Sequence, residues 1–305
     1  MKTFFVVNPS SANGSTGKKW GELQALIARA IPDFAQAFTQ RPMHAAELAR
    51  AALKEGFECV VAVGGDGTIN EVVNGFFEDG KVVNPKAALG VVSRGTGGDF
   101  RKTFGWDTDF AAALKRVASG TSVPFDVGEL EFRGHDGQTG RRYFANICSF
   151  GVSGVVDQEV NRTSKVLGGK LSFMLASTKA LLKYEDRKVR FSVDGGPAED
   201  VLVTTLAVAN GKYFGGGMKV APDADTGDGT FDVTIWSGYT LMDFALKQSA
   251  IYSGQHVGWK GTRLLKCKTL TAESAQEVLI DCDGEQPGKL PCKMTILPAA
   301  IQLRT

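Results

Sequence analysis

Residues 60–75 read VVAVGGDGTINEVVNG, and this stretch decides the fold. Its β-branched valines predict a strand, and the apolar residues Ile69, Val72 and Val73 recur at the spacing of one helix face. A glycine-rich turn therefore joins a strand to a helix, where glycines let a ligand approach the backbone and the helix N–H groups favour an anion. A phosphate is the expected ligand, yet the carboxylate of Asp66 lies in the turn and would repel it unless a cation separates them.

The composition is that of an ordinary globular protein of 305 residues, 43% hydrophobic and 22% charged. A formal net charge of +2 gives no field that attracts nucleic acid, so no nucleic-acid partner is expected. The first apolar run stops at Asn8 and is too short for a secretion signal, and no run reaches the roughly 18 residues that indicate a membrane span. The five cysteines have neither metal nor disulfide spacing, so we expect a cytoplasmic protein with reduced thiols.

The sequence pattern changes near Pro124. Before it, short apolar strands alternate with helical stretches, which is typical of a parallel sheet with crossover helices. The strands predicted there are Thr3–Val7, Phe34–Thr39, Cys59–Val63 and Ala88–Ser93, and the helices include Ala45–Leu53 and Phe110–Ala118. After it, strands follow one another and predict a mostly antiparallel sheet or sandwich. These strands are Phe125–Phe132, Arg142–Cys148, Lys188–Val193, Val201–Ala209, Thr230–Trp236, Arg263–Leu270, Val278–Cys282 and Lys293–Leu297, with helical insertions at Leu171–Lys183 and Leu241–Tyr252.

Three familiar motifs fail on their spacing. The dinucleotide fingerprint G-x-G-x-x-G would need a glycine where Asn70 stands. The loop at Asn13–Lys19 has only two residues between its glycines, where a Walker loop has four. The acidic stretch that begins at Asp223 has Thr234 where an EF-hand closes with Glu. The turn around Asp66 therefore belongs to another kind of site.

Six motifs, in order along nearly the whole chain, closely resemble the diacylglycerol kinase catalytic-domain family. That family includes bacterial soluble lipid kinases, sphingosine kinases and ceramide kinases. The motifs are Asn8-Pro9-Ser10-Ser11, the stretch from Gly64 to Gly75, Gly95-Thr96-Gly97-Gly98-Asp99-Phe100, the stretch from Asn210 to Gly217, Pro222-Asp223-Ala224 with Asp228-Gly229, and Asp283-Gly284-Glu285. One glycine motif would be weak evidence, whereas six in sequence are specific.

The resemblance implies a fold and an activity. The fold is an α/β ATP-binding domain with a parallel sheet at residues 1–124, of the NAD kinase and diacylglycerol kinase type, and a mostly antiparallel β-sandwich lipid-binding domain at 125–292. A C-terminal strand at about 293–305 returns to the first domain. The activity is ATP-dependent transfer of the γ-phosphoryl group to the hydroxyl of diacylglycerol or a related lipid alcohol, with Mg²⁺. The lipid substrate implies transient, peripheral contact with a membrane surface, and a homodimer is a candidate assembly.

The resemblance also places the nucleotide at the glycine turns. There, main-chain N–H groups would reach the phosphates, and Asp66 would act through magnesium and its waters. The implied nucleotide-binding residues are Asn8, Pro9, Ser10, Ser11, Ala12, Thr39, Gly64, Gly65, Asp66, Gly67, Thr68, Ile69, Asn70, Glu71 and Thr96. The alternative is a tight strand-to-helix turn in which Asp66 only caps the helix, with Thr39 an ordinary strand-end residue.

The second glycine turn departs from the common family pattern. Ser93 replaces a frequent Pro, Gly98 a frequent Asn, and Arg101-Lys102 a frequent Ala-Arg. Nucleotide binding tolerates these changes, whereas the hydrogen bonding around the acceptor alcohol is affected. Asp99 remains the candidate acid on the substrate side.

An acidic turn precedes the strand predicted from Thr230. Carboxylate and carbonyl oxygens are the ligands that hard cations prefer. By resemblance, Asp225, Asp228 and the main-chain carbonyl of Thr230 would bind a magnesium ion. The alternative is a solvated turn, because tight turns also require Asp and Gly.

The Asp283-Gly284-Glu285 motif follows another predicted strand. A lipid hydroxyl is a weak nucleophile at neutral pH, and a positioned carboxylate can take its proton as the bond to phosphorus forms. The resemblance assigns the base to this motif, and we expect Glu285 to accept the proton while Asp283 supports it. The reverse assignment is open, as is a plain hairpin turn.

A basic, apolar stretch is a candidate for membrane docking. Its lysines are Lys165, Lys170, Lys179 and Lys183, and its apolar residues are Leu167, Leu171, Phe173, Met174, Leu175, Leu181 and Leu182. Such a stretch is typical of an amphipathic helix at a bilayer surface. A core-facing helix with solvated lysines is the alternative.

Three classes of function remain. The first is a lipid kinase acting on diacylglycerol or a long-chain amino alcohol, which includes sphingoid and ceramide kinases. The second is a soluble-substrate kinase of the NAD kinase type, which shares the Gly-Gly-Asp-Gly-Thr turn. In that type the Asn-Glu pair usually lies far downstream, whereas Asn70-Glu71 follows at once. The third is a non-catalytic nucleotide-binding regulator, disfavoured because Asp66, Asp283 and Glu285 are all retained.

Overall fold

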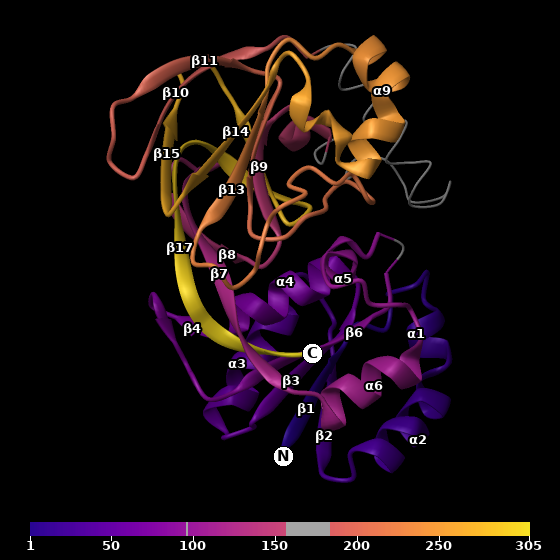
Figure 1. The fold of residues 1–305 in the computed structure, drawn as a ribbon. Coiled ribbons are helices and arrows are strands. Elements are labelled where there is room, and N and C mark those ends of the chain that lie inside the picture. The colour runs from indigo at the N-terminus through magenta and orange to yellow at the C-terminus, as the bar shows by residue number, and fades with distance from the viewer. Residues whose placement is uncertain (96, 157–183) are drawn as a thin grey trace. The chain divides into compact units, whose positions relative to one another are not determined.

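The computed structural model describes residues 1–95, 97–156 and 184–305, which form two compact units (Figure 1). The first unit contains Met1–Val127 and Pro298–Thr305, and the second contains Gly128–Leu297. The long last strand, β17 (Glu285–Arg304), contributes residues to both units. The predicted fold class, an α/β domain followed by a β-sandwich, is confirmed.

The first unit contains a parallel sheet in the order β17-β6-β3-β1-β2. Its other strands are β1 (Thr3–Val7), β2 (Phe34–Phe38), β3 (Cys59–Gly64) and β6 (Ala88–Ser93). The central strands are buried apolar runs, as expected for a parallel sheet covered on both faces. All four strands lie where the sequence predicts them, within one residue at each end.

In the described residues of the first unit, six helices connect or follow these strands. They are α1 (Ser15–Lys18), α2 (Trp20–Ala30), α3 (His44–Lys54), α4 (Asp66–Gly75), α5 (Asp99–Thr103) and α6 (Phe110–Ser119), with a small hairpin of β4 (Phe77–Glu78) and β5 (Lys81–Val82) after α4. Trp20 and Ile27 of α2 and Val117 of α6 share one buried cluster with Val61 and Val63 of β3. Helix α4 starts directly after the glycine turn that follows β3. Its apolar residues Ile69, Val72 and Val73 are buried, and its first residue, Asp66, lies at the carboxyl end of β3.

The described residues of the second unit form two runs of paired strands that share β17. The first run is β8-β7-β17-β15-β10-β11, and the second is β14-β13-β12-β9-β16-β17. The bounds are β7 (Ser122–Gly134), β8 (Thr139–Phe144), β9 (Ile147–Gly151), β10 (Arg187–Val193), β11 (Glu199–Val203), β12 (Thr205–Ala209), β13 (Phe231–Trp236), β14 (Thr262–Cys267), β15 (Thr269–Glu273) and β16 (Leu279–Cys282). Neighbouring strands are antiparallel in the pairs β7-β8, β9-β12, β9-β16, β10-β11, β10-β15, β12-β13, β13-β14, β15-β17 and β16-β17.

Three strands predicted as single elements are each two strands, so those predictions are wrong. Arg142–Cys148 divides into β8 and β9, Val201–Ala209 into β11 and β12, and Arg263–Leu270 into β14 and β15. At each break the chain passes from one run of paired strands to the other. The sequence pattern does not reveal such a break, because only one or two residues separate the two strands and what differs is their pairing partners.

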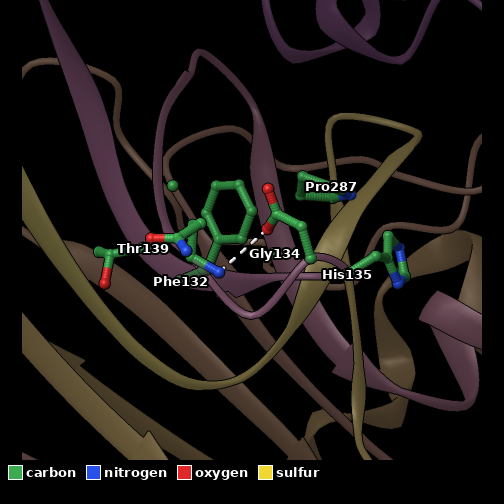
Figure 2. A pocket seen from close by; sticks show the side chains of 8 residues that line it. Phe132, Gly134, His135, Thr139 and Pro287 are labelled. Carbon is green, nitrogen blue, oxygen red and sulfur yellow. Dashed lines mark hydrogen bonds between the residues drawn. The ribbon is translucent and has the colours of Figure 1, made fainter.

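The hairpin of β7 and β8 has a polar turn at its tip. His135 lies in this turn, and its Nε2 lies 2.9 Å from Gln286 Oε1 of β17. Residues of the hairpin and Pro287 line an open hollow of about 410 Å³ (Figure 2). The Gln138 N–H donates to Asp136 Oδ1 (3.0 Å) and closes the turn.

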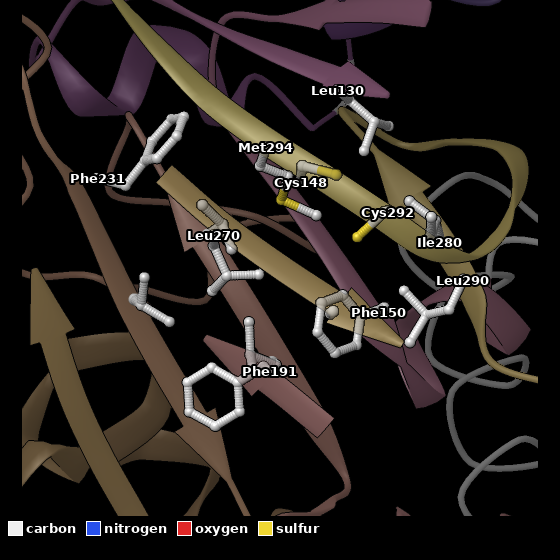
Figure 3. Packing of buried hydrophobic residues seen from close by; sticks show 14 of the residues in the cluster. Leu130, Cys148, Phe150, Phe191, Phe231, Leu270, Ile280, Leu290, Cys292 and Met294 are labelled. Carbon is white, nitrogen blue, oxygen red and sulfur yellow. The ribbon is translucent and has the colours of Figure 1, made fainter. Parts of the chain in front are cut away.

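Side chains from both runs of strands meet in one apolar core (Figure 3). Leu130 and Leu270 come from the first run, Phe150 and Ile280 come from the second, and Met294 comes from the shared strand β17. The five cysteines are buried free thiols.

The predicted helix at Leu241–Tyr252 is α9 (Leu241–Ser253), followed by the short 3₁₀ helix η2 (Gln255–Gly258). In the part of the chain that the structure describes, no helix is long and apolar enough to cross a membrane.

Candidate functional site

Three loops of the first unit meet at the carboxyl ends of its strands. Asn8 follows β1, and its Nδ2 donates to Thr68 Oγ1 (3.1 Å) at the start of α4. The Asn8 N–H donates to the Val63 carbonyl (2.9 Å), so this loop is fastened to β3 as well. The carboxyl edge of a parallel sheet is where α/β folds bind ligands.

The loop after β1 is held by its own polar groups. Asn8 Oδ1 accepts the Ser10 N–H (3.0 Å), and the Ser11 hydroxyl donates to the Asn8 carbonyl (2.8 Å). Ser11 Oγ also lies 2.7 Å from Thr16 Oγ1. Ala12 adopts a left-handed conformation, with φ 51°, as the loop turns back. Residues 8–12 therefore form one compact turn beside Thr68.

The two glycine turns of the first unit touch through their backbones. A Cβ atom added to Gly95 would lie 2.7 Å from the Cα of Gly65, and one added to Gly64 would clash with the Thr68 side chain. A larger residue at Gly95 would push these turns apart, and one at Gly64 would displace the Thr68 side chain. The glycine residues therefore bring the loops after β3 and β6 together.

The Asp66 carboxylate lies between these turns and accepts backbone N–H groups of the second one. Its Oδ2 accepts from Asp99 (3.1 Å) and its Oδ1 from Phe100 (3.2 Å). Asp66 thus satisfies the first N–H groups of α5 and joins the two turns. Burial and the nearby charge of Asp99 raise the pKa of the Asp66 carboxyl. The Asp99 carboxylate is itself paired with Lys102 Nζ (2.8 Å).

Other predicted nucleotide residues make contacts within the protein through their side chains or main chain. The Glu71 carboxylate accepts the Ala45 N–H (3.0 Å) and caps the start of α3. Ile69 is buried, and Asn70 accepts from the Asn74 amide through its carbonyl (2.9 Å). The Thr39 N–H donates to the Val7 carbonyl (2.9 Å), which places Thr39 at the end of β2. These residues shape the edge of the sheet.

Two groups of predicted site residues lie outside the residues that the structure describes. The first is Thr96 of the second glycine turn. The second is the basic, apolar stretch that contains Lys165, Lys170, Lys179 and Lys183, together with the helix predicted at Leu171–Lys183.

Arg94 is a site residue that the sequence reasoning missed. It follows β6, and its half-buried guanidinium donates from Nε to Thr16 Oγ1 (2.9 Å) and from Nη2 to Ser15 Oγ (3.3 Å). Among the described residues, no carboxylate forms an ion pair with it. An arginine held by neutral hydroxyls beside two glycine turns retains its positive charge for an anion. Its position directly before Gly95, in the second glycine turn, is the feature of the sequence that could have identified it.

In the second unit, the Asp283 carboxylate accepts three backbone N–H groups. Its Oδ2 accepts from Ala145 (2.8 Å), and its Oδ1 accepts from Asn146 (3.1 Å) and Ile147 (2.8 Å). These donors lie at the break between β8 and β9, where the strand ladder cannot supply acceptors. Asp283 adopts φ 51° in doing so. Its oxygens therefore hold the main chain of residues 145–147 in place.

Glu285 follows two residues later as the first residue of β17, and it is exposed. The turn between the two acids is closed by Asp281, whose Oδ1 accepts the Gly284 N–H (2.8 Å). Asp281 is buried and also accepts from the Ser149 hydroxyl (3.2 Å). The carboxylates of Asp281 and Asp283 therefore fix the conformation of the turn from which Glu285 is exposed. The sequence reasoning missed Asp281 because it lies inside a buried strand.

The Asn210-Gly211 motif packs on the same break between β8 and β9. Asn210 is buried, and its Nδ2 donates to the Ala145 carbonyl (2.9 Å). The N–H groups of Asn210 and Gly211 both donate to the Asn146 carbonyl (2.9 Å each). This motif therefore supports the segment that Asp283 holds.

The acidic turn before β13 is paired with the ammonium group of Lys266. Asp228 Oδ1 accepts from the Thr230 N–H (2.9 Å) and hydroxyl (2.8 Å), and its Oδ2 accepts from Lys266 Nζ (2.9 Å). The hydrogen bond to Asp228 raises the pKa of Lys266, which keeps the ammonium charged. Asp225 instead accepts the Gly227 N–H (3.0 Å) within the turn. These residues do not fit the divalent cation expected from the sequence, and the described residues contain no group of three or more acids, histidines or cysteines that could hold a metal.

Comparisons with known proteins agree with this organisation. Residues 2–130 match the model of the Diacylglycerol kinase catalytic domain, and residues 146–305 match that of the YegS C-terminal NAD kinase beta sandwich-like domain. A diacylglycerol kinase of Staphylococcus carnosus (strain TM300) is 27% identical over 98% of this chain and 94% of its own length. A diacylglycerol kinase of Bacillus subtilis (strain 168) is 29% identical over 87% of this chain and 86% of its own length.

Solved structures share the fold. A putative diacylglycerol kinase from Bacillus anthracis str. Sterne superposes with a TM-score of 0.78 at 22% identity, over 99% of this chain and 96% of the other. Yeast NADH kinase complexed with NADH superposes with a TM-score of 0.52 at 12% identity, over 99% of this chain and 78% of the other.

Proposed function

Because the chain belongs to the diacylglycerol kinase catalytic-domain family, whose members phosphorylate an alcohol, we propose that it transfers the γ-phosphoryl group of ATP to the hydroxyl of diacylglycerol or a related lipid alcohol. The observation that carries this proposal is the turn between β16 and β17. There Asp283 is held by three backbone N–H groups while Glu285 is exposed on the next strand.

The donor binds at the loops of the first unit in this proposal. Its triphosphate lies against the backbone of the turns at Gly64–Gly67 and Gly95, where glycine permits close approach. Arg94 adds a positive charge to the phosphates. Magnesium enters with the nucleotide as part of the substrate and neutralises phosphate charge. Asp66 keeps the two turns at the spacing that the phosphates need.

Glu285 accepts the proton of the lipid hydroxyl. As that proton moves to the Glu285 carboxylate, the alcohol oxygen forms a bond to the γ-phosphorus, the bond from that phosphorus to the bridging oxygen breaks, and ADP leaves. Asp283 takes no proton in this scheme and acts by positioning, because its oxygens hold the main chain of residues 145–147. The lipid acceptor also requires the enzyme to contact a membrane surface peripherally, which co-sedimentation with lipid vesicles would detect.

A transfer assay on the full chain tests the proposal. The protein is incubated with radiolabelled ATP and one acceptor at a time: diacylglycerol, sphingosine or ceramide in mixed micelles, NAD in solution, and no acceptor. We expect label in phosphorylated diacylglycerol at a rate well above the sample without acceptor. Labelled NADP, or phosphate released equally with and without acceptor, would overturn it.

A further inference from the structure

The turn at residues 225–230 and the two strands that follow it form a small charged cluster in the second unit. Strand β13 pairs with β14 so that Asp232 lies directly opposite Lys266. The Lys266 ammonium lies 2.9 Å from Asp228 Oδ2 and 3.2 Å from Asp232 Oδ2. One lysine therefore joins the acidic turn to the neighbouring pair of strands.

The Lys266 ammonium compensates the charge of both carboxylates, which differ in their burial. Asp228 is partly exposed, and its other oxygen is occupied by the N–H and hydroxyl of Thr230. Asp232 is more buried: its side chain is 16% exposed, against 30% for Asp228. The Lys266 charge is then the compensation for a carboxylate that has lost most of its water.

A divalent ion at this turn would compete with the ammonium. Magnesium demands octahedral oxygen ligands at about 2.0–2.1 Å, and calcium demands six to eight at about 2.3–2.6 Å. An ion bound to Asp228 Oδ2 would therefore lie within a few ångströms of the ammonium, and two cations at that separation repel each other. The second expected ligand, the Asp225 side chain, is engaged with Gly227.

We propose that Lys266 is the resident cation of this turn and takes the place of the magnesium ion that the family resemblance led us to expect. The ammonium ties Asp228 to β13 and β14, so the second unit is stable without a divalent metal. This inference does not depend on the identity of the lipid substrate, and it concerns only the metal in the acidic turn, not magnesium bound to the nucleotide.

Thermal unfolding of the nucleotide-free full chain tests the inference without any variant. An ion bound at a hundred times its dissociation constant would raise the Tm by roughly 5 °C. We expect the wild-type Tm to be the same in EDTA and in millimolar Mg²⁺ or Ca²⁺. A rise of that size with either metal would overturn the proposal.

Lys266→Met sharpens the test, because it removes the charge and keeps most of the side-chain stem. Asp228 and Asp232 then face each other without compensation, so the Tm should fall in EDTA and recover in Mg²⁺ or Ca²⁺. Lys268→Met is the matched control, since Lys268 is an exposed lysine two residues further along the chain, and its Tm should be unchanged in all three conditions. A Lys266→Met protein that matches Lys268→Met in EDTA would also overturn the proposal. Should Lys266→Met not fold at all, the wild-type comparison alone decides.

Discussion

The turn after β3 and the turn between β16 and β17 are both held by an aspartate, but they differ in the acid that lies near it. In each, the carboxylate of an aspartate accepts N–H groups from a loop distant in sequence: Asp66 from Asp99 and Phe100, and Asp283 from residues 145–147. The difference lies in the neighbouring acid. Asp99 is paired with Lys102, whereas Glu285 is exposed.

This difference matches the roles that we propose for the two turns, which are nucleotide binding for the first and proton transfer for the second. The first turn has its acids neutralised by N–H groups and a lysine, which favours holding an anionic ligand nearby. The second turn holds one acid and presents another, which is the arrangement that a general base requires. In both turns the aspartate therefore holds a distant loop, and our proposal assigns the proton transfer to Glu285, the acid that follows Asp283.

The largest effect is expected at Glu285. Glu285→Gln keeps the shape of the side chain and removes its basicity, so kcat for lipid phosphorylation should fall by about 10²–10⁴. ATP affinity should not change, because the proposed nucleotide contacts lie in the first unit. Glu273→Gln is the control, since Glu273 is an exposed acid of β15, and it should keep full activity. Steady-state kinetics on diacylglycerol micelles check this, and full activity of Glu285→Gln would remove the distinction between the two turns.

The next effect concerns the anion site of the first turn. Arg94→Met should raise the KM for ATP by roughly tenfold or more, because a hydrogen bond to a charged group contributes about 1.5–3 kcal/mol. Binding of adenosine, which has no phosphate, should be unaffected. Arg29→Met, an exposed arginine in the last turn of α2, is the control. If adenosine and ATP lose affinity equally in calorimetric titrations, Arg94 only supports the loop.

A smaller effect is a dependence on pH that comes from Asp66. The pKa of this carboxyl is raised by burial and by Asp99, so the folded protein holds the proton more tightly than the unfolded chain. That contribution to stability is present below the unfolded pKa of about 3.9 and is lost as the pH rises through the folded value. The stability lost in Asp66→Asn should therefore be larger near pH 4 than near pH 7, as measured by urea unfolding of both proteins at each pH. A larger loss near pH 7 would contradict the assignment.

Sequence reasoning predicts what depends on local pattern. The strand, turn and helix at residues 60–75 follow from apolar periodicity and glycine, and all three appear where predicted. The partners of Asp66 could not be predicted, because its N–H donors lie more than thirty residues away and are placed by the contact between Gly65 and Gly95. The hydrogen bond from the Ala45 N–H to the Glu71 carboxylate could not be predicted either, because it joins two helices that are distant in sequence.

The second unit shows the same limit. The breaks between β8 and β9, β11 and β12, and β14 and β15 depend on which strands pair, and this is a property of the whole sheet. At two of these breaks an aspartate accepts the N–H groups that the ladder leaves over: Asp283 between β8 and β9, and Asp194 at Lys268 and Thr269. An acid within a turn motif thus has a structural task that only the pairing of distant strands reveals.

The most direct test of the account compares Asp283→Asn with Glu285→Gln in urea unfolding. Asp283→Asn places an amide against backbone N–H donors and should lower the free energy of unfolding by about 1–3 kcal/mol. Glu285→Gln changes an exposed side chain and should alter it by less than about 0.5 kcal/mol. The account predicts a clear loss of stability in the first variant and none in the second. Equal stability of the two variants would contradict the claim that one acid of this turn holds the chain while the other reacts.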